Sequence, residues 1–118
     1  MKINQRDIVE VNFELPNGNF KTHPALVISN QQVLDAEDIF YNVMISSKEY
    51  NDEFTFELKD LMLTKPLSKR SYVKCQLLQS YFVNEVISKI STVKPPYLEK
   101  IKQTIFDTVF WLLQIKVY

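Results

Sequence analysis

The spacing of apolar residues changes once along this chain, at Lys94-Pro95-Pro96, and this change limits the folds that the chain can adopt. Before it, apolar residues alternate with polar ones or form short β-branched runs, which is typical of strands. After it, they recur every three or four residues, as on one face of a helix. The residues with the helical spacing are Leu98, Ile101, Ile105, Val109 and Leu112. The pattern predicts strands followed by one long helix from about Pro96 to Leu112.

Further large apolar residues widen the apolar surface of this helix beyond one stripe. They are Phe106, Phe110, Trp111 and Leu113. Such a surface either caps the core of the fold or contacts a second subunit. Exposed apolar patches of this size are uncommon on monomers, so we expect the core role for these residues.

Several short stretches before residue 85 have the composition of strands. In 8–13, apolar residues alternate with polar ones, and Pro16-Asn17-Gly18-Asn19 then supplies turn residues, so a hairpin is predicted. The apolar run 25–29 predicts a strand buried on both faces, and the polar stretch 30–38 predicts a loop. The other predicted strands are 39–45, 54–58 and 71–78, the last followed closely by 81–83. Together they predict a mainly β fold, a small barrel over residues 8–83.

Composition and charge exclude several classes of protein. With 118 residues, 46% hydrophobic and 24% charged, the chain is predicted to form a single domain, 1–118. A net charge of zero disfavours a protein that coats nucleic-acid duplexes but permits a local basic groove. The only cysteine, Cys75, and the only histidine, His23, make neither an internal disulfide nor a zinc site. Cys75 is predicted to be a buried apolar residue, and no metal or cofactor is expected.

The beginning of the chain is polar and lacks the apolar core of a signal peptide. No uncharged apolar run of about 18 residues occurs, which is the length that crosses a bilayer. We therefore expect a cytoplasmic protein.

Three stretches resemble the MazF/PemK family of bacterial toxins, and the likeness spans nearly the whole chain. Residues 6–13 resemble the opening strand of that family, usually Gly-Asp-Ile-Val followed by an alternating run. Residues 21–29, Lys-Thr-His-Pro-Ala-Leu-Val-Ile-Ser, resemble its Lys-x-Arg-Pro-Ala-Leu-Val-Ile-Ser stretch and carry the most specific match. Residues 71–78 resemble a later strand that usually ends in Gln-Ile-Arg-Thr.

The resemblance implies an SH3-like β-barrel with a C-terminal α-helix and the activity of a type II toxin. Family members are metal-independent endoribonucleases that cut single-stranded mRNA at short sequences. They act as homodimers and are neutralised by a small antitoxin protein. The reaction needs a base for the ribose 2′-OH, an acid for the leaving 5′-oxygen, and donors that stabilise the phosphorane charge. In the family, the Arg before Pro and a Thr or Ser that ends the third main strand supply much of this.

This chain departs from the family pattern at three positions. His23 replaces the Arg before Pro, Arg6 replaces the Gly before Asp, and Leu78 stands where the later strand carries Arg. Ser46 keeps the hydroxyl group at the end of the third strand. Two cations of the family are therefore absent, at His23 and Leu78.

His23 and Ser46 are the candidate catalytic residues. An imidazole titrates near neutral pH, so His23 could transfer a proton or hold a phosphate, or it could be a loop residue without a function. Ser46 could bond a phosphate oxygen, or it could complete a turn at the strand end. Lys69 and Arg70 would join the predicted RNA-binding residues if the fold gathers them in one basic groove. The predicted RNA-binding residues are Lys21, Ser47, Lys48, Lys74, Gln76 and Gln79.

Two functions of other classes remain open. The cations missing at His23 and Leu78 favour a non-catalytic module that binds nucleic acid or a protein. A toxin resembling the CcdB gyrase poisons, which share the barrel, would act through the end of the helix, where 111–118 are bulky. The stretch 21–29 favours a MazF-like toxin over a CcdB-like one. A short upstream reading frame for an acidic antitoxin would support either toxin over the binding module.

Overall fold

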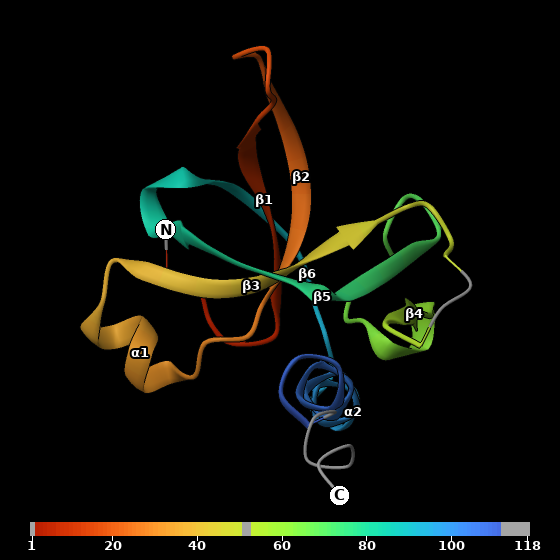
Figure 1. Ribbon diagram of the computed structural model, residues 1–118. Coiled ribbons are helices and arrows are strands. Elements are labelled where there is room, and N and C mark those ends of the chain that lie inside the picture. The colour runs from red at the N-terminus through yellow and green to blue at the C-terminus, as the bar shows by residue number, and fades with distance from the viewer. Residues whose placement is uncertain (1, 51–52, 112–118) are drawn as a thin grey trace, which may run out of the picture.

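The computed structural model describes residues 2–50 and 53–111, which form a coiled antiparallel sheet with one long helix against it (Figure 1). The strands are β1 (Asp7–Glu14), β2 (Phe20–Val27), β3 (Ile39–Ser46), β4 (Thr55–Leu58), β5 (Ser71–Phe82) and β6 (Val86–Thr92). The helices are α1 (Gln31–Ala36) and α2 (Pro95–Phe106), with single 3-10 turns η1 (Asp60–Met62) and η2 (Val83–Glu85). A π-helical turn, η3 (Asp107–Trp111), continues α2. The strands predicted at 39–45 and 71–78 are confirmed.

The six strands form one sheet in the order β4-β5-β3-β2-β1-β6, and every neighbouring pair is antiparallel. The sheet coils without closing, because β4 and β6 are its edges. In the described part of the chain, the ends of the sheet meet at the bridge between Leu63 and Val93 rather than along a ladder. The mainly β fold with a C-terminal helix is confirmed, and "barrel" describes the curvature of this sheet.

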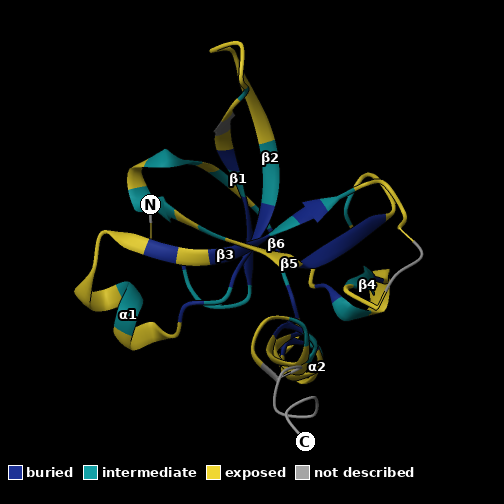
Figure 2. Cartoon of the chain, in the orientation of Figure 1, coloured by how far each residue is buried: buried dark blue, intermediate teal, exposed yellow. Residues whose placement is uncertain are grey.

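Hydrophobic side chains pack on both faces of the sheet. The larger cluster contains Leu26 of β2 together with Leu98 and Ile101 of α2, so it lies between the sheet and the helix. The smaller cluster contains Val27. Successive residues of β2 thus enter different clusters, as the period of two in a strand requires. The predicted burial of 25–29 on both faces is confirmed for β2 (Figure 2).

The hairpin of β1 and β2 projects from the body of the sheet, and its tip is exposed (Figures 1 and 2). Gly18 has a φ of 87°, a left-handed conformation that glycine adopts without steric cost. The Leu15 amide donates to the Asn19 carbonyl at 2.7 Å, and the Asn19 amide donates to Asn17 Oδ1 at 3.0 Å. The predicted hairpin and its turn are confirmed.

The predicted loop at 30–38 was wrong, because it contains the short helix α1. Asn30 caps this helix: its Oδ1 accepts a hydrogen bond from the Val33 amide at 3.0 Å. Val33 and Leu34 are the half-buried apolar residues of α1, and Leu34 packs against the smaller cluster. A helix of six residues with two apolar side chains is too short to show a helical period.

The predicted limit of the sheet at residue 83 was also wrong. β6 follows it and pairs with β1, with irregular register on either side of the pairs Val9–Lys89 and Glu10–Ser88. These irregularities break the alternation of apolar and polar residues along β6. Ile87 is consequently exposed while Ser91 is buried, the opposite of what their polarity suggests.

The apolar stripe of the terminal helix is only partly buried. Leu98, Ile101 and Ile105 pack in the larger cluster as predicted, but Val109 is exposed. The helix changes to π geometry after Phe106, and the wider turn rotates later residues away from the stripe. Phe106 and Phe110 are also exposed, with ring centroids 6.0 Å apart, so the predicted core role for these two was wrong. Leu112 and Leu113 lie outside the described residues, as does the side chain of Trp111.

Among the described helices, none combines the length and the hydropathy needed to cross a lipid bilayer.

A candidate anion-binding cleft

The candidate site lies where β2 and β3 separate. The ladder between these strands has three residue pairs and ends at Ala25–Met44. Pro24 is the next residue of β2, and without an N–H group it cannot donate to a neighbouring strand. If the same register continued, His23 would lie opposite Ser46. The proline of the 21–29 stretch therefore marks the point where the sheet opens and leaves these two side chains at the opening.

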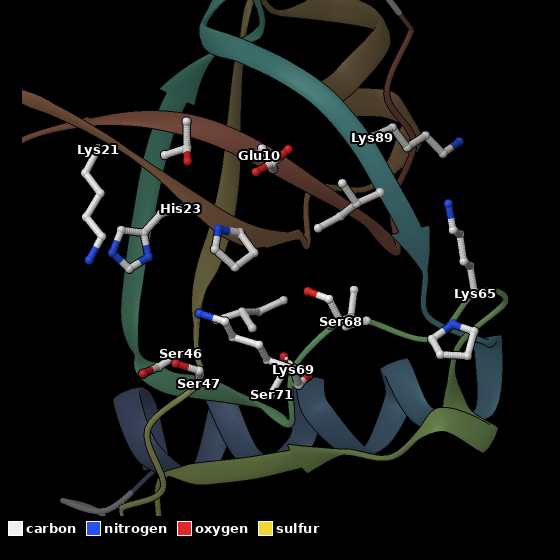
Figure 3. Close-up of a pocket in the computed structure, with 16 residues that line it drawn as sticks. Glu10, Lys21, His23, Ser46, Ser47, Lys65, Ser68, Lys69, Ser71 and Lys89 are labelled. Atoms are coloured by element: carbon white, nitrogen blue, oxygen red, sulfur yellow. Dashed lines mark hydrogen bonds between the residues drawn. The ribbon is translucent and has the colours of Figure 1, made fainter.

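The opening leads into a cleft of about 670 Å³. Lys21 and His23 form one side of it, the end of β3 forms the floor, and the segment 65–71 faces them (Figure 3). Glu10 of β1 and Lys89 of β6 complete the lining. The full lining is Glu10, Lys21, Thr22, His23, Pro24, Ile45, Ser46, Ser47, Lys65, Pro66, Leu67, Ser68, Lys69, Ser71, Lys89 and Ile90.

The cleft is basic although the chain has no net charge. Four lysines line it, at positions 21, 65, 69 and 89, against one carboxylate, that of Glu10. Cations grouped in a cleft with low-dielectric walls create a local positive potential that attracts anions. Hydroxyl groups of Ser46, Ser47 and Ser68 add hydrogen-bond donors along the same lining. The arrangement suits a polyanionic ligand.

His23 is half-buried in the cleft wall, and its surroundings shift its pKa. Burial lowers the pKa of His23 below its ordinary value of 6.5, because a partly buried imidazole is poorly solvated when charged. The positive charge of Lys21 lowers it further, and a hydrogen bond to the backbone of Ile45 offsets part of the decrease. His23 is therefore mostly neutral at pH 7 and can accept a proton there.

Ser46 has a structural contact as well as a place in the cleft. Its Oγ accepts a hydrogen bond from the Lys48 amide at 3.1 Å, which tightens the turn after β3. A serine hydroxyl that accepts one hydrogen bond still has its own O–H to donate. The turn-forming role considered for Ser46 is thus present, and a donor remains for a ligand.

The predicted RNA-binding residues are divided by the fold. Lys21 and Ser47 line the cleft, as does Lys69, whereas Lys48, Lys74, Arg70, Gln76 and Gln79 do not. Lys74 is buried: its Nζ lies 2.9 Å from Thr55 Oγ1 and 3.7 Å from the centroid of the Tyr50 ring. Lys48 Nζ also lies over that ring, at 5.4 Å.

Several lining residues were missed by the sequence analysis, chiefly Glu10, Lys65, Ser68 and Lys89. Glu10 lies in the predicted strand 8–13, where it pairs with Pro24 and accepts a hydrogen bond from Ser88 Oγ at 2.8 Å. Lys65 and Ser68 belong to an irregular segment without periodicity. Lys89 could have been found only by predicting its strand, β6, and the sequence analysis did not predict that strand.

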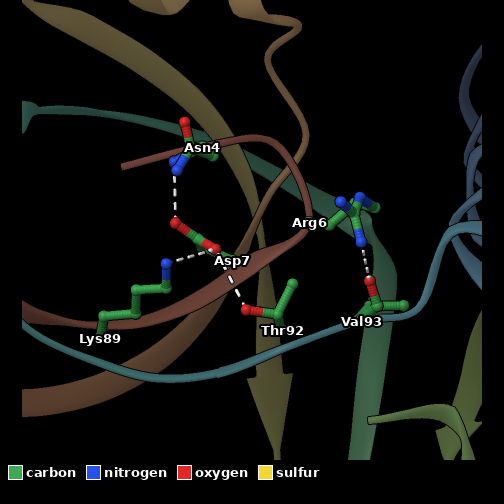
Figure 4. A network of polar contacts seen from close by, with 6 residues as sticks. All are labelled: Asn4, Arg6, Asp7, Lys89, Thr92 and Val93. Atoms are coloured by element: carbon green, nitrogen blue, oxygen red, sulfur yellow. Dashed lines mark hydrogen bonds and ion pairs between the residues drawn. The ribbon is translucent and has the colours of Figure 1, made fainter. Parts of the chain in front are cut away.

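The buried side chain of Asp7 contacts both Lys89, which lines the cleft, and Asn4, which precedes β1 (Figure 4). Its Oδ1 lies 3.2 Å from Lys89 Nζ and accepts from Thr92 Oγ1 at 3.2 Å, while Oδ2 accepts from the Asn4 amide at 2.8 Å. Arg6 has a φ of 83°, a left-handed conformation that favours glycine, and its Nη1 donates to the Val93 carbonyl at 2.9 Å. This left-handed φ explains why the family that the sequence resembles usually has glycine before the aspartate.

Residues 2–50 and 53–111 contain no group of three His, Cys, Asp or Glu side chains arranged to hold a metal ion. The thiol of Cys75 is buried in the larger cluster, as predicted, so it is not a nucleophile of the cleft.

Residues 4–108 match the family of PemK-like, MazF-like toxins of type II toxin–antitoxin systems. A comparison with curated protein sequences gives no match. Among solved structures, an endoribonuclease from a mycobacterial species is similar with a TM-score of 0.75 at 13% identity, over 92% of both chains. An endoribonuclease in complex with its cognate antitoxin, also mycobacterial, gives 0.76 at 13% identity, over 91% of this chain and 94% of that one. A MazE–MazF structure from Deinococcus radiodurans gives 0.77 at 14% identity, over 92% and 96%. At such identities the likeness shows a shared fold.

Proposed function

Because the chain belongs to the PemK-like, MazF-like toxins of type II toxin–antitoxin systems, we propose that it is a sequence-specific endoribonuclease that cuts single-stranded mRNA. The observation that carries this proposal is the basic cleft, in which a histidine with a lowered pKa lies beside hydroxyl groups and lysines. The similar structures include endoribonucleases, one of them in complex with its antitoxin, which supports the same activity. The protein acts in the cytoplasm, where mRNA is available, as a single domain of residues 1–118.

The proposed reaction needs only the substrate, the side chains of the cleft and water. Neutral His23 accepts the proton of a ribose 2′-OH, and the 2′-oxygen forms a bond to the adjacent phosphorus. The bond from phosphorus to the 5′-oxygen breaks, and that oxygen takes up a proton from a water molecule. His23 then releases its proton to the solvent and returns to the neutral form. Ser46 donates a hydrogen bond to a phosphate oxygen, while Lys21 and Lys69 offset the charge of the phosphorane. The products are a 2′,3′-cyclic phosphate and a 5′-hydroxyl end, and no metal takes part.

Residues outside the cleft would contact nucleotides beyond the cut. Lys48, Gln76 and Gln79 lie at exposed or half-buried positions from which they can reach a longer RNA strand. Lys74 could do so only after leaving Thr55 and the Tyr50 ring. We therefore propose that Lys21, Ser47 and Lys69 contact the RNA at the cut, and that this group contacts nucleotides farther along the strand.

We further propose that the protein is a homodimer bound by an antitoxin protein. Exposed apolar residues support a partner surface: Leu77, Leu78, Phe106, Val109 and Phe110. The turn η3 contacts β5, so the residues of the helix end lie near those of β5. Leu78 stands where the family has Arg, which adds apolar surface at this place. A mass of 13.9 kDa by light scattering at micromolar concentration would contradict the dimer.

Incubation of the purified protein with mixed-sequence single-stranded RNA in EDTA tests the activity. We expect cuts at a short shared sequence and cyclic phosphate ends by mass spectrometry. His23→Ala, purified in parallel, controls for a contaminating nuclease and should not cut. Retained RNA binding without cuts would instead support the alternative that the replaced arginines favour, a non-catalytic binding module. Inhibition of gyrase without RNA cuts would support the CcdB-like alternative.

A further inference from the structure

We propose that Lys65 and Lys89 form a second phosphate-binding site in the cleft, which holds a phosphodiester other than the one that is cut. This inference rests on the proposed function, because it takes single-stranded RNA as the ligand. The two lysines line the end of the cleft away from His23 and Ser46 (Figure 3). Two cations that line one end of a cleft attract an anion to that end.

Asp7 holds Lys89 in place at this end of the cleft. The aspartate is 2% exposed, and besides its contact with Lys89 Nζ it accepts hydrogen bonds from the Asn4 amide and the Thr92 hydroxyl (Figure 4). An ammonium group has three N–H donors, so Lys89 keeps donors for a phosphate after its contact with Asp7. A cation that is already held in place loses less side-chain entropy when it binds a ligand.

Ser91 holds the backbone of Lys65 against the same strand. Its Oγ donates to the Lys65 carbonyl at 2.6 Å and accepts from the Lys65 amide at 3.3 Å. The Thr64 amide donates to the Thr92 carbonyl at 2.9 Å, so the segment follows β6 over two residues. Ser91 and Lys89 are two residues apart on β6, and the register of the pairing with β1 shifts between them. One strand thus positions both lysines.

The distribution of charge in the cleft favours a nucleic-acid backbone over a single small anion. Lys21 and Lys69 lie toward the His23 end, and Lys65 and Lys89 lie at the other end, with Glu10 between them (Figure 3). Two basic regions separated by an acidic group match an anionic polymer whose charges repeat at intervals. A cleft of about 670 Å³ is also larger than one phosphate group requires.

The first test is binding, which needs no cleavage. The dissociation constant of a mixed-sequence single-stranded RNA is measured at several salt concentrations for the full chain, for Lys65→Ala, for Lys89→Ala and for the double variant. Each single change should weaken binding on the order of 10-fold, and the double change by less than the product, since both lysines contact one phosphate. The salt slope of the double variant should fall by about 0.7, the value for one phosphate of a single strand. Lys102→Ala on α2, which pairs with Glu99 away from the cleft, should leave binding unchanged.

The second test locates the phosphate. Each phosphate of an RNA that contains the mapped cut sequence, with a 2′-deoxy residue at the cut, is replaced in turn by an uncharged methylphosphonate. At one position other than the scissile phosphate, the replacement should weaken binding to the unmodified protein but not to the double variant. The second site would be overturned if the replacement that weakens binding only to the unmodified protein were at the scissile phosphate. It would also be overturned if every replacement weakened binding equally. Unchanged RNA binding together with weaker binding of a ten-residue polyglutamate peptide would also overturn it, in favour of an acidic peptide.

The two tests separate this inference from the proposed function. If the protein cuts RNA but the lysine variants bind it unchanged, the second phosphate site is wrong and the proposed function stands. If the variants bind RNA weakly with the smaller salt slope but no protein cuts it, the endoribonuclease is wrong and the phosphate site stands. The methylphosphonate scan then uses the mixed-sequence RNA component that binds best.

Discussion

The two ends of the cleft are built differently. At the His23 end, the pairing of β2 and β3 stops at Pro24, and backbone groups hold the side chains. The backbone of Ile45 forms a hydrogen bond with the imidazole of His23, and the Lys48 amide donates to Ser46 Oγ. At the Lys89 end, a buried carboxylate, Asp7, fixes a cation through a side-chain contact. The first arrangement leaves a group with a lowered pKa free to exchange protons, whereas the second fixes charge. We infer that chemistry occurs at the first end and that the second end positions the substrate.

The largest expected effect is that of His23→Ala on RNA cleavage. If His23 is the general base, its loss should lower kcat by about 100-fold or more. His23→Arg restores the family residue and a permanent cation, so it separates two roles. It should lose activity if His23 transfers protons, and keep or gain activity if His23 only binds the phosphate. A His23→Ala protein that cuts as fast as the unmodified one would remove this residue from the mechanism.

The pH dependence of cleavage is the next test of the His23 end. Burial and Lys21 lower the pKa of His23 below 6.5, so the neutral form that accepts a proton predominates at pH 7. The rate should therefore fall as the pH decreases through this lowered pKa and should reach a plateau above it. Lys21→Gln removes the positive charge beside His23, which should move the acidic limb to higher pH. A rate that falls as the pH rises through 6.5 would instead make His23 the acid.

The sequence predicted the His23 end of the cleft and missed the other. The stretch 21–29 carries its own signals: Pro24 and a β-branched run locate the strand, and the resemblance to the toxin family marks His23. Lys65 lies in an irregular segment, and Lys89 lies on a strand whose irregular pairing hides its alternation. No local pattern predicts that Thr64 and Lys65 pack against β6, because that contact joins residues far apart in the chain. The strands in which apolar and polar residues alternate regularly were predictable, because that alternation is a local pattern.

Ser46 should contribute less than His23 to cleavage. Ser46→Ala removes one hydrogen bond to a charged phosphate oxygen, worth about 1.5 kcal/mol or roughly 10-fold in rate. It also removes the acceptor for the Lys48 amide, so thermal unfolding must be measured beside the activity. Ser46→Thr keeps the hydroxyl and should retain most of the rate. Equal losses in the two variants would point to the shape of the turn after β3 rather than to the hydroxyl.

Asp7→Asn tests whether the Lys89 end is held as tightly as its contacts suggest. The change keeps the shape but leaves a buried donor facing donors, so the free energy of unfolding should fall by about 1–2 kcal/mol. Lys89→Ala should cost less, because the Lys89 side chain is 41% exposed whereas that of Asp7 is 2% exposed. Urea unfolding of both variants measures the difference. A larger loss for Lys89→Ala would mean that the buried carboxylate of Asp7 depends on its cation more than on its two hydrogen-bond donors.

Arg6 gives the smallest expected effect and separates conformational strain from bonding beside Asp7. Arg6→Ala removes the hydrogen bond to the Val93 carbonyl and keeps the strained φ of 83°, so it should lower the free energy of unfolding by about 0.5–1.5 kcal/mol. Arg6→Gly loses the same bond but removes the strain, which is worth about 1–2 kcal/mol for a left-handed residue. The glycine variant should therefore be about 1 kcal/mol more stable than the alanine variant and close to the unmodified protein. Equal stability of the two variants in urea would show that the backbone at this position relaxes when the arginine is removed. The glycine that the family usually has here would then need another explanation than φ.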